Sequence, residues 1–461
     1  SSRTWPSLAG MLQLSTRLRA VRPAIVRARA RSTAASTGQK KVVLVDGCRI
    51  PFQPSRGEYF DLMSYDLTRL AMHGLLTKTA VDPKAIDYVL WGKVIQEPKT
   101  SNIARDAAFA AGIPRGVPAH TVTQACISSN QAICTGASQI LSGQAEVVLA
   151  GGVETFSDAP IRYSRPIRKK LIKMSKAKSP GQMASIFFKG LKMKDLAPEQ
   201  PAIANFLTGE VMGHNADRLS DRFGVSRREQ EEFALRSHLN AANAHADGFY
   251  DGEVIAGPGG KTLEDGPRAD SSLEKMATLK PAFVKPHGTV TAASASPFTD
   301  GASATLLMSD GKASELGLSP KAELLAYAFV ACDPFEELLL GPTYGASKVL
   351  RMAGLSLKDI DVIEFHEAFA GQVLSNLVAM DSDKFFAENL PGVDKVGSVD
   401  MTKLNTKGGS LSIGHPFGAT GARLVTTAAN RLVKEGGTYA LVAACADGGL
   451  GHACILKRYG A

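Results

Sequence analysis

A series of predicted strands and helices in the first third of the chain returns in the same order in its last third, and this repeat limits the fold more than any other feature. Residues 81–94 read VDPKAIDYVLWGKV, and residues 355–368 read LSLKDIDVIEFHEA. Residues 142–152, SGQAEVVLAGG, are matched in the same way by residues 435–445, EGGTYALVAAC. Because strands that alternate with helices are typical of layered α/β domains, the repeat predicts two similar α/β halves.

The repeat also predicts how the chain is divided. We expect one half to comprise residues 38–158 and 286–312 and the other to comprise residues 313–461. A different segment, residues 159–285, is expected between them as an inserted loop domain. With 461 residues, of which 44% are hydrophobic, the chain is long enough for two or three packed cores.

The basic residues at the start of the chain account for its net charge. Residues 1–45 hold nine arginines and lysines and no acidic residue, which leaves 44 basic and 44 acidic residues in the rest of the chain. A general nucleic-acid-binding surface is therefore not expected. Arginines separated by apolar residues and serines, without acids, are typical of a mitochondrial transit peptide, which we predict for residues 1–37. A disordered basic tail is the alternative.

A second basic stretch lies inside the predicted insert. Residues 161–194 carry eleven arginines and lysines and no acid, with apolar residues between them. A solvated charged loop is the ordinary interpretation of such a run. The alternation of basic and apolar residues favours docking to an anionic membrane surface or to an acidic partner.

Two cysteines stand eight residues apart in TQACISSNQAIC, residues 123–134. If Cys126 lies in a turn and Cys134 two turns into the following helix, they are roughly 12 Å apart. That separation is too large for a disulfide or for two ligands of one zinc ion. We expect Cys134 to be a core residue. Cys126, beside capping residues at a helix start, is either a buried inert thiol or a nucleophile whose pKa the helix lowers.

The second half supplies groups that favour the nucleophile. His415 precedes Pro416, a residue suited to a first helical turn, in the glycine-rich stretch GGSLSIGHPFGATGAR. Cys445 lies at the end of an apolar strand, where a loop can expose it, and His366 lies at another expected strand end. Loops at the carboxyl ends of strands are where α/β proteins place their sites. We therefore expect Cys126 to react and these residues to assist it.

Other classes of function are not supported by the sequence. GPGGKT, residues 257–262, lacks the first glycine of a phosphate-binding loop, and no G-x-G-x-x-G follows the first strand, which disfavours a nicotinamide dehydrogenase. The nine histidines and six cysteines show no zinc-site spacing, so no metal site is expected. No run of eighteen apolar residues predicts a membrane-spanning helix.

The motifs together resemble those of the thiolase family. TQACISSNQA is similar to the family's nucleophile motif, TVTAASASPFTDGAS to its coenzyme A loop, and GGSLSIGHPFGATGAR and CADGGLG to its two C-terminal signatures. The resemblance extends from about Lys41 to Lys457 in order. HEAF stands where many thiolases have Asn-Glu-Ala-Phe. Because the chain has this HEAF, the leader and the basic insert, it is most similar to mitochondrial long-chain 3-ketoacyl-CoA thiolases that form the β subunit of a larger complex.

The resemblance implies a role for each site residue. His415 takes the proton of Cys126, whose thiolate attacks the keto carbon of a 3-ketoacyl-CoA. Cys445 protonates the acetyl-CoA enolate that leaves and then deprotonates incoming coenzyme A, a substrate and not a cofactor. One oxyanion site is implied to use His415 with a group held by His366, and the other to use the backbone N–H groups of Cys126 and Asp447.

Two further residues are implied by the resemblance. Ser296, at the serine of the coenzyme A loop, is implied to contact the pantetheine. Asp447 replaces the first glycine of the usual Cys-x-Gly-Gly-Gly, and we expect its carboxylate to raise the pKa of Cys445 or to crowd the acetyl group.

The resemblance also implies the fold and the surroundings of the enzyme. The expected fold is α/β, with two βαβ-type halves in an α-β-α-β-α arrangement. The expected assembly is a homodimer of thiolase subunits within a hetero-oligomer containing an α subunit, on the matrix side of the mitochondrial inner membrane. An acetoacetyl-CoA thiolase is one alternative, and a non-catalytic acyl-CoA or lipid carrier on the same fold is another.

Overall fold

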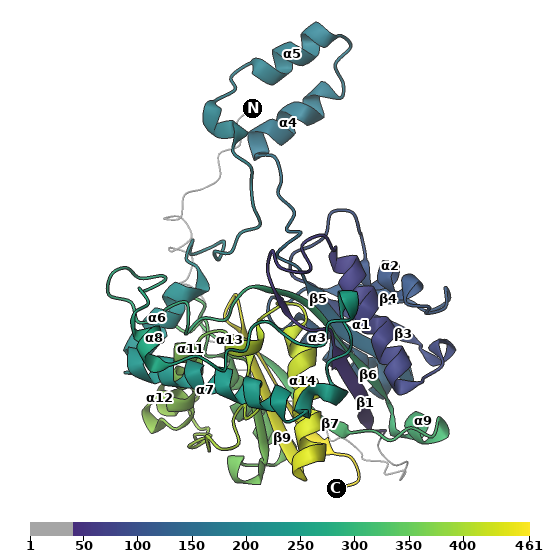
Figure 1. Cartoon of the computed structure of the whole chain (residues 1–461), viewed down its shortest axis with the longest axis vertical. Helices are drawn as coiled ribbons and strands as arrows, with labels where there is room; N and C mark the ends of the chain where they lie inside the picture. Colours follow the sequence, from purple (N-terminus) through teal and green to yellow (C-terminus); the bar gives the residue numbers. More distant parts are fainter. Residues whose placement is uncertain (1–39) are drawn as a thin grey trace, which may run out of the picture. The chain divides into compact units, whose positions relative to one another are not determined.

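The computed structural model describes residues 40–461, which form one compact unit. The predicted transit peptide, residues 1–37, lies outside the described residues. The unit contains a sheet whose strands follow the order β4-β3-β5-β6-β1-β7-β10-β9-β8, with β2 paired to β6 (Figure 1). The strands are β1 (Val42–Arg49), β2 (Gln53–Pro54), β3 (Tyr88–Gly92), β4 (Ala119–Val122), β5 (Val147–Glu154), β6 (Thr299–Ser309), β7 (Ala322–Ala331), β8 (Val362–Phe365), β9 (Tyr439–Ala446) and β10 (Leu450–Arg458).

Helices lie on the faces of this sheet and in the insert. Those of the two halves are α1 (Ser64–Thr79), α2 (Ile103–Ala110), α3 (Ser128–Leu141), α9 (Asp310–Glu315), α10 (Gly341–Ala353), α11 (Ala370–Met380), α12 (Asp383–Asn389), α13 (Ser410–Ile413) and α14 (Thr420–Glu435). Those of the insert are α4 (Arg165–Met174), α5 (Pro180–Phe188), α6 (Met212–Arg222), α7 (Arg227–Ala246) and α8 (Leu273–Ala277). Short 3₁₀ helices are η2 (Pro83–Ala85), η3 (Met193–Leu196), η4 (Phe249–Gly252), η5 (Pro258–Gly260) and η6 (Leu357–Asp359).

The strand order contains the predicted repeat. In the first half β3 pairs in parallel with β5, which pairs antiparallel with β6, and β6 pairs antiparallel with β1. In the second half β8, β9, β10 and β7 repeat the same sequence of pairings. Antiparallel pairing of β1 with β7 joins the halves. The two similar halves are therefore confirmed, while the residue limits 38–158, 159–285, 286–312 and 313–461 stay a prediction.

Asp87 and Asp361, which stand at equivalent positions of the two halves, accept equivalent hydrogen bonds. The Asp87 carboxylate accepts hydrogen bonds from the backbone N–H groups of Glu146 and Val147, at 2.7 and 2.9 Å. The Asp361 carboxylate does the same for Thr438 and Tyr439, at 2.6 and 3.1 Å. Each aspartate thus holds the start of the neighbouring strand, which explains why Ile-Asp recurs in both copies of the repeat.

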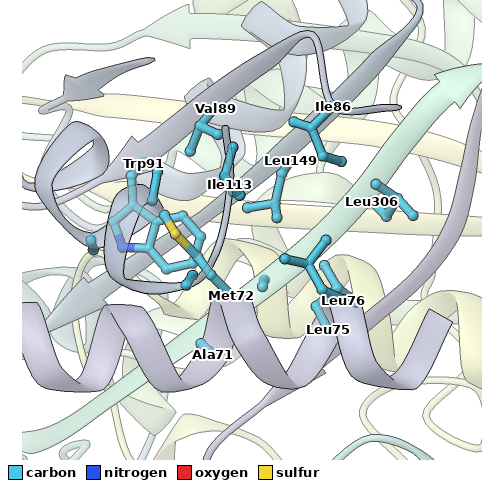
Figure 2. Packing of buried hydrophobic residues seen from close by; sticks show 14 of the residues in the cluster. Ala71, Met72, Leu75, Leu76, Ile86, Val89, Trp91, Ile113, Leu149 and Leu306 are labelled. Carbon is cyan, nitrogen blue, oxygen red and sulfur yellow. The ribbon is translucent and has the colours of Figure 1, made fainter. Parts of the chain in front are cut away.

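The outer face of the first half packs against α1 and α2. Trp91 and Leu149, on adjacent strands, are buried in the same cluster as Met72 and Leu75 of α1 (Figure 2). Leu90 and Val148, the alternate residues of those strands, belong to the cluster on the opposite face. Side chains that alternate between faces explain why both strands are apolar throughout.

Helices α3 and α14 form the middle layer. They contact each other and share one buried cluster with strands of both halves. Every residue of α14 from Thr420 to Leu432 is buried, as expected for a helix covered on all sides. Helices α10 and α11 pack on the outer face of the second half. The layers therefore run α-β-α-β-α, as predicted.

The predicted insert consists of two differently packed parts. Helices α6 and α7 pack against α11 of the second half. Helices α4 and α5 pack against each other, and Figure 1 shows this hairpin apart from the layers. At its base the backbones of Arg162 and Glu199 exchange two hydrogen bonds of 2.8 and 2.7 Å. The basic stretch 161–194 is thus a helical hairpin, and most of its residues are exposed. Within residues 40–461, none of the helices is both long and apolar enough to cross a bilayer.

Candidate active site

Cys126 lies in the short connection between β4 and α3. The backbone of Ala125 has a φ of 44°, in the left-handed region. The Ser128 hydroxyl holds the connection by donating to the Ala125 carbonyl and accepting from the Gln124 N–H, at 2.7 and 2.8 Å. This turn places Cys126 two residues before the helix start, as predicted, with only 3% of its surface exposed.

Burial reverses one expectation for Cys126. The helix start was expected to lower the pKa of the thiol, but burial and, after it, the Asp447 carboxylate raise that pKa to about 12. Backbone N–H groups of Asp447 and Cys126 itself act in the opposite direction. Because desolvation outweighs these donors, Cys126 is a neutral thiol at rest and needs a base to react.

Cys134 has the surroundings of a core residue. It lies two turns into α3, where it is 2% exposed, and its Sγ is 3.4 Å from His452 Nε2. All six cysteines are free thiols. The two cysteines of the 123–134 stretch therefore form no disulfide.

His415 lies in the glycine-rich turn that leads into α14. Gly414 has a φ of 108°, and a Cβ at Gly418 would lie 2.3 Å from the Val153 carbonyl oxygen, so both positions require glycine. Pro416 is not in the first helical turn, because α14 begins at Thr420. The Pro416 carbonyl instead accepts a 3.1 Å hydrogen bond from the Thr420 hydroxyl.

That hydrogen bond determines the tautomer of His415. The Thr420 hydroxyl uses its proton on Pro416, so its oxygen accepts from His415 Nδ1, at 2.6 Å. The lone pair of the neutral ring is then on Nε2, which is buried and has no hydrogen-bond partner among residues 40–461. Burial, followed by the influence of His366, keeps the pKa of His415 well below 6.5. His415 is therefore a neutral base with an available Nε2.

His366 follows β8 and faces His415. Its backbone N–H donates to the Ala443 carbonyl, and its Nδ1 is 3.1 Å from the Ser410 hydroxyl oxygen. The two imidazole rings are 4.1 Å apart between centroids. Burial and then the Arg423 charge lower the pKa of His366 to about 3. Its Nε2 also lacks a partner within the described part of the chain.

Three groups from separate parts of the chain thus meet at one point. Cys126 Sγ and a ring nitrogen from each of His366 and His415 all lie within 4.8 Å of one another. A thiol beside two neutral imidazoles can transfer its proton over a short path and become a nucleophile. The arrangement is suited to acyl transfer.

Cys445 lies next to this group, near the end of β9. Contrary to expectation, no loop exposes it, because β10 pairs along β9 and its side chain is fully buried. Burial raises its pKa well above 9.0, and the neighbouring Cys126 raises it further. Asp447 is not among the groups that shift the pKa of Cys445, so the expectation that it would raise this pKa is wrong: its carboxylate acts on Cys126 instead.

The structure also shows side chains that the sequence did not single out. Asn205, in the insert, donates from Nδ2 to the Asp447 carboxylate at 3.0 Å. Phe417 contacts His415, with 4.8 Å between ring centroids, and Phe156 and Phe298 pack against it. Phe298 and Phe417 stand in the motifs TVTAASASPFTDGAS and GGSLSIGHPFGATGAR, but no motif marks Asn205, because only folding brings the insert to Asp447.

Ser296 lies in a segment whose backbone is hydrogen-bonded both near His366 and at His415. Its backbone N–H donates to the Ala368 carbonyl at 3.0 Å, and the next carbonyl, of Pro297, accepts from the backbone of His415 at 3.3 Å. The Ser296 side chain is half-buried. The stretch TVTAASASPFTDGAS, residues 289–303, therefore runs between the segments that carry the two histidines.

Comparison with known families identifies the fold. The model of the thiolase N-terminal domain matches residues 42–311, and that of the thiolase C-terminal domain matches residues 318–458. The chain is a member of the thiolase family. Cys126 belongs to the first matched region of this thiolase, and His366, His415 and Cys445 belong to the second, so the site forms where the two family domains meet.

Similar proteins cover nearly the whole of this thiolase. The human mitochondrial trifunctional enzyme subunit beta is 54% identical over 452 residues, which are 97% of this chain and 94% of the relative. A probable 3-ketoacyl-CoA thiolase of Caenorhabditis elegans is 52% identical over 96% of this chain and 100% of its own length. The crystal structure of human mitochondrial 3-ketoacyl-CoA thiolase has a TM-score of 0.77 at 29% identity, covering 92% of this chain and 100% of that one.

Proposed function

We propose that this thiolase cleaves long-chain 3-ketoacyl-CoA with coenzyme A, releasing acetyl-CoA and an acyl-CoA shortened by two carbons, as in the last step of fatty-acid β-oxidation. The observation that carries the proposal is the meeting of Cys126, His366 and His415 within 4.8 Å. The names of the two similar proteins, a trifunctional enzyme subunit beta and a probable 3-ketoacyl-CoA thiolase, agree with this substrate class.

In the first half-reaction His415 acts as the base. Its Nε2 lone pair takes the Cys126 proton as Sγ attacks C3, the keto carbon. When the Ser410 hydroxyl donates to His366 Nδ1, the proton of this imidazole is on Nε2 and can be donated to the developing oxyanion. The C2–C3 bond then breaks, which leaves an acyl group on Cys126 and an acetyl-CoA enolate. The Cys445 thiol protonates C2 of this enolate.

In the second half-reaction coenzyme A removes the acyl group. The Cys445 thiolate left by the first step takes the proton of the coenzyme A thiol, whose sulfur attacks the acyl-Cys126 thioester. Backbone N–H groups of Cys126 and Asp447, which already interact favourably with the Cys126 sulfur, stabilise this oxyanion. Ser296 contacts the pantetheine arm. Breakdown of the tetrahedral intermediate returns Cys126 as a thiolate, which His415 reprotonates.

The same proposal includes the setting of the enzyme. We place it in the mitochondrion, on the matrix side of the inner membrane, as the β subunit of a hetero-oligomer with an α subunit, in agreement with the name of the human relative. The exposed basic hairpin of residues 161–194 docks to the anionic membrane surface. At its base lies a hollow of about 500 Å³ lined by Ile161, Arg162, Tyr163, Arg168 and Pro198, where both arginines pair with Glu199.

Turnover measurements on one long and one short substrate test the proposal. With a long-chain 3-ketoacyl-CoA and coenzyme A, we expect rapid acetyl-CoA release that Cys126→Ala reduces by at least about 10³-fold, because no other group forms the thioester. Cys134→Ala, which removes a buried thiol outside the site, is the matched control and should retain activity.

Each alternative has a distinct result. Preference for acetoacetyl-CoA over the long-chain substrate would indicate the acetoacetyl-CoA thiolase. Tight binding of acyl-CoA without acetyl-CoA release would indicate the carrier. Undiminished turnover by Cys126→Ala would remove Cys126 from the mechanism.

A further inference from the structure

Cys126, His366 and His415 have the chemical composition of a soft-metal site. One thiol sulfur and two imidazole nitrogens lie within 4.8 Å of one another, and all three residues are buried. They come from the connection before α3, the end of β8 and the turn before α14. A Cys-His₂ set is a ligand combination that zinc prefers.

Both imidazoles are held in the way that metal-binding histidines usually are. His415 Nδ1 is hydrogen-bonded to Thr420 at 2.6 Å, and His366 Nδ1 to Ser410 at 3.1 Å. Such outer contacts fix the ring and direct the other nitrogen toward the metal. Each remaining Nε2 is buried and has no partner within residues 40–461. Two unpartnered nitrogens beside a thiol are the independent sign of a ligand site.

The geometry requires a small adjustment only. Zinc–sulfur and zinc–nitrogen bonds of about 2.3 and 2.1 Å in a tetrahedron place ligand atoms roughly 3.4–3.6 Å apart. The ligand atoms now lie within 4.8 Å of one another, so each pair must close by at most about 1.4 Å, which side-chain rotations can supply. Cys126 and His415 are each 3% exposed, and His366 is fully buried.

We propose that the substrate-free site binds one soft divalent cation, of which Zn²⁺ is the representative, through Cys126 Sγ and a nitrogen of each of His366 and His415. Binding releases the thiol proton to solvent, and the proton of His366 resides on Nδ1 while Nε2 binds the metal. The fourth position is left for water. The bound sulfur no longer attacks a carbonyl, so the cation is an inhibitor and not a cofactor. The inhibition rests on the proposed role of Cys126, whereas the binding does not.

Cobalt(II) titration of the substrate-free, full-length protein tests the binding without an activity readout. We expect one equivalent of Co²⁺ to produce a thiolate-to-cobalt charge-transfer band, and Zn²⁺ to abolish it by displacement. The band should disappear in Cys126→Ala. His366→Asn should weaken Co²⁺ binding by more than about tenfold, because one of three ligands is lost. Cys134→Ala, which removes a thiol 3.4 Å from a different histidine, should keep the band.

A second measurement needs no variant. Zn²⁺ should protect Cys126 of the wild-type protein from iodoacetamide, measured by peptide mass spectrometry. Absence of the band in the wild type, its persistence in Cys126→Ala, its loss in Cys134→Ala, or unprotected alkylation of Cys126 with Zn²⁺ present would overturn the site. If the site binds Co²⁺ and Zn²⁺ but Zn²⁺ leaves turnover unchanged, the inhibitory role is overturned.

Discussion

Asp447 connects the insert to the nucleophile. Its backbone N–H stabilises charge on the Cys126 sulfur, whereas its carboxylate opposes that charge. Asn205 donates to this carboxylate from a tight turn, in which the Asn205 side-chain oxygen accepts the backbone N–H of Leu207 at 2.9 Å. Through this hydrogen bond the insert positions Asp447.

Asp447→Asn should make Cys126 easier to ionise. Burial and the Asp447 charge raise the pKa of Cys126 to about 12, and a neutral amide removes the second contribution, so the pKa falls. Because only the thiolate is alkylated, the pH profile of iodoacetamide modification at Cys126 should move to lower pH. Asp270→Asn, at an exposed position paired with Lys275, is the control. An unmoved profile in Asp447→Asn would show that the carboxylate does not influence the thiol.

At the scale of an element, the lysines of the α4–α5 hairpin are of two kinds, one that holds the hairpin together and others that are exposed. Lys170 donates to the carbonyls of Ile186 and Lys189 and so ties α4 to the C-terminal end of α5. Lys169 and Lys173 of α4 and Lys176, just after its end, are exposed. Apolar side chains of the hairpin, among them Ile172 and Phe188, are also largely exposed. Basic and apolar groups on one exposed element suit an anionic lipid surface.

Neutralising the exposed lysines should weaken lipid binding while the hairpin stays folded. Each lysine near an anionic bilayer contributes about 1 kcal/mol, so replacing Lys169, Lys173 and Lys176 by glutamine should weaken partition to cardiolipin-containing liposomes by about 10²-fold. Flotation or sedimentation with liposomes measures the change.

A control with the same change in charge is available elsewhere on the chain. The exposed residues Lys84, Lys358 and Lys384, replaced by glutamine, should leave binding almost unchanged. Equal losses in the two triple variants would show that net charge, and not the hairpin, attracts the lipid.

At the scale of the whole molecule, the two ends of the sheet are not equivalent. At the β8 end, Ile363 forms a bridge with Leu404, which covers that edge in part. At the other end β4 pairs with β3, and all four of its residues are half-buried. An open edge strand is suited to pairing with another chain. This edge is consistent with the proposed dimer of thiolase subunits.

The assembly prediction concerns the complex as it exists in the organelle. After gentle detergent extraction of mitochondria, native mass spectrometry should find this chain in a complex larger than a dimer. The complex should contain at least two copies of this chain together with copies of a second, different subunit. Salt that releases the complex from the membrane should leave the complex itself intact, because the hairpin and the sheet edge are separate surfaces. A homodimer without any other subunit would contradict the hetero-oligomer.

The sequence alone determined the repeat, the layered α/β class and the three residues that we propose to react. Strand and helix patterns depend on the spacing of apolar side chains, which is local, and Cys126, His415 and Cys445 stand in motifs that are readable without a structure. The recurrence of Asp87 and Asp361 in the two copies of the repeat is readable in the same way.

Only the tertiary structure decided how these residues behave. Sequence predicted a lowered pKa for Cys126 and an exposed Cys445, and both predictions were wrong. Of the two effects expected of Asp447, a raised pKa of Cys445 is not seen, because its carboxylate acts on Cys126. Desolvation depends on what packs around a group, and here that packing comes from segments about three hundred residues away. The same long-range packing brings two histidines and a thiol together where no spacing in the chain indicated a metal site.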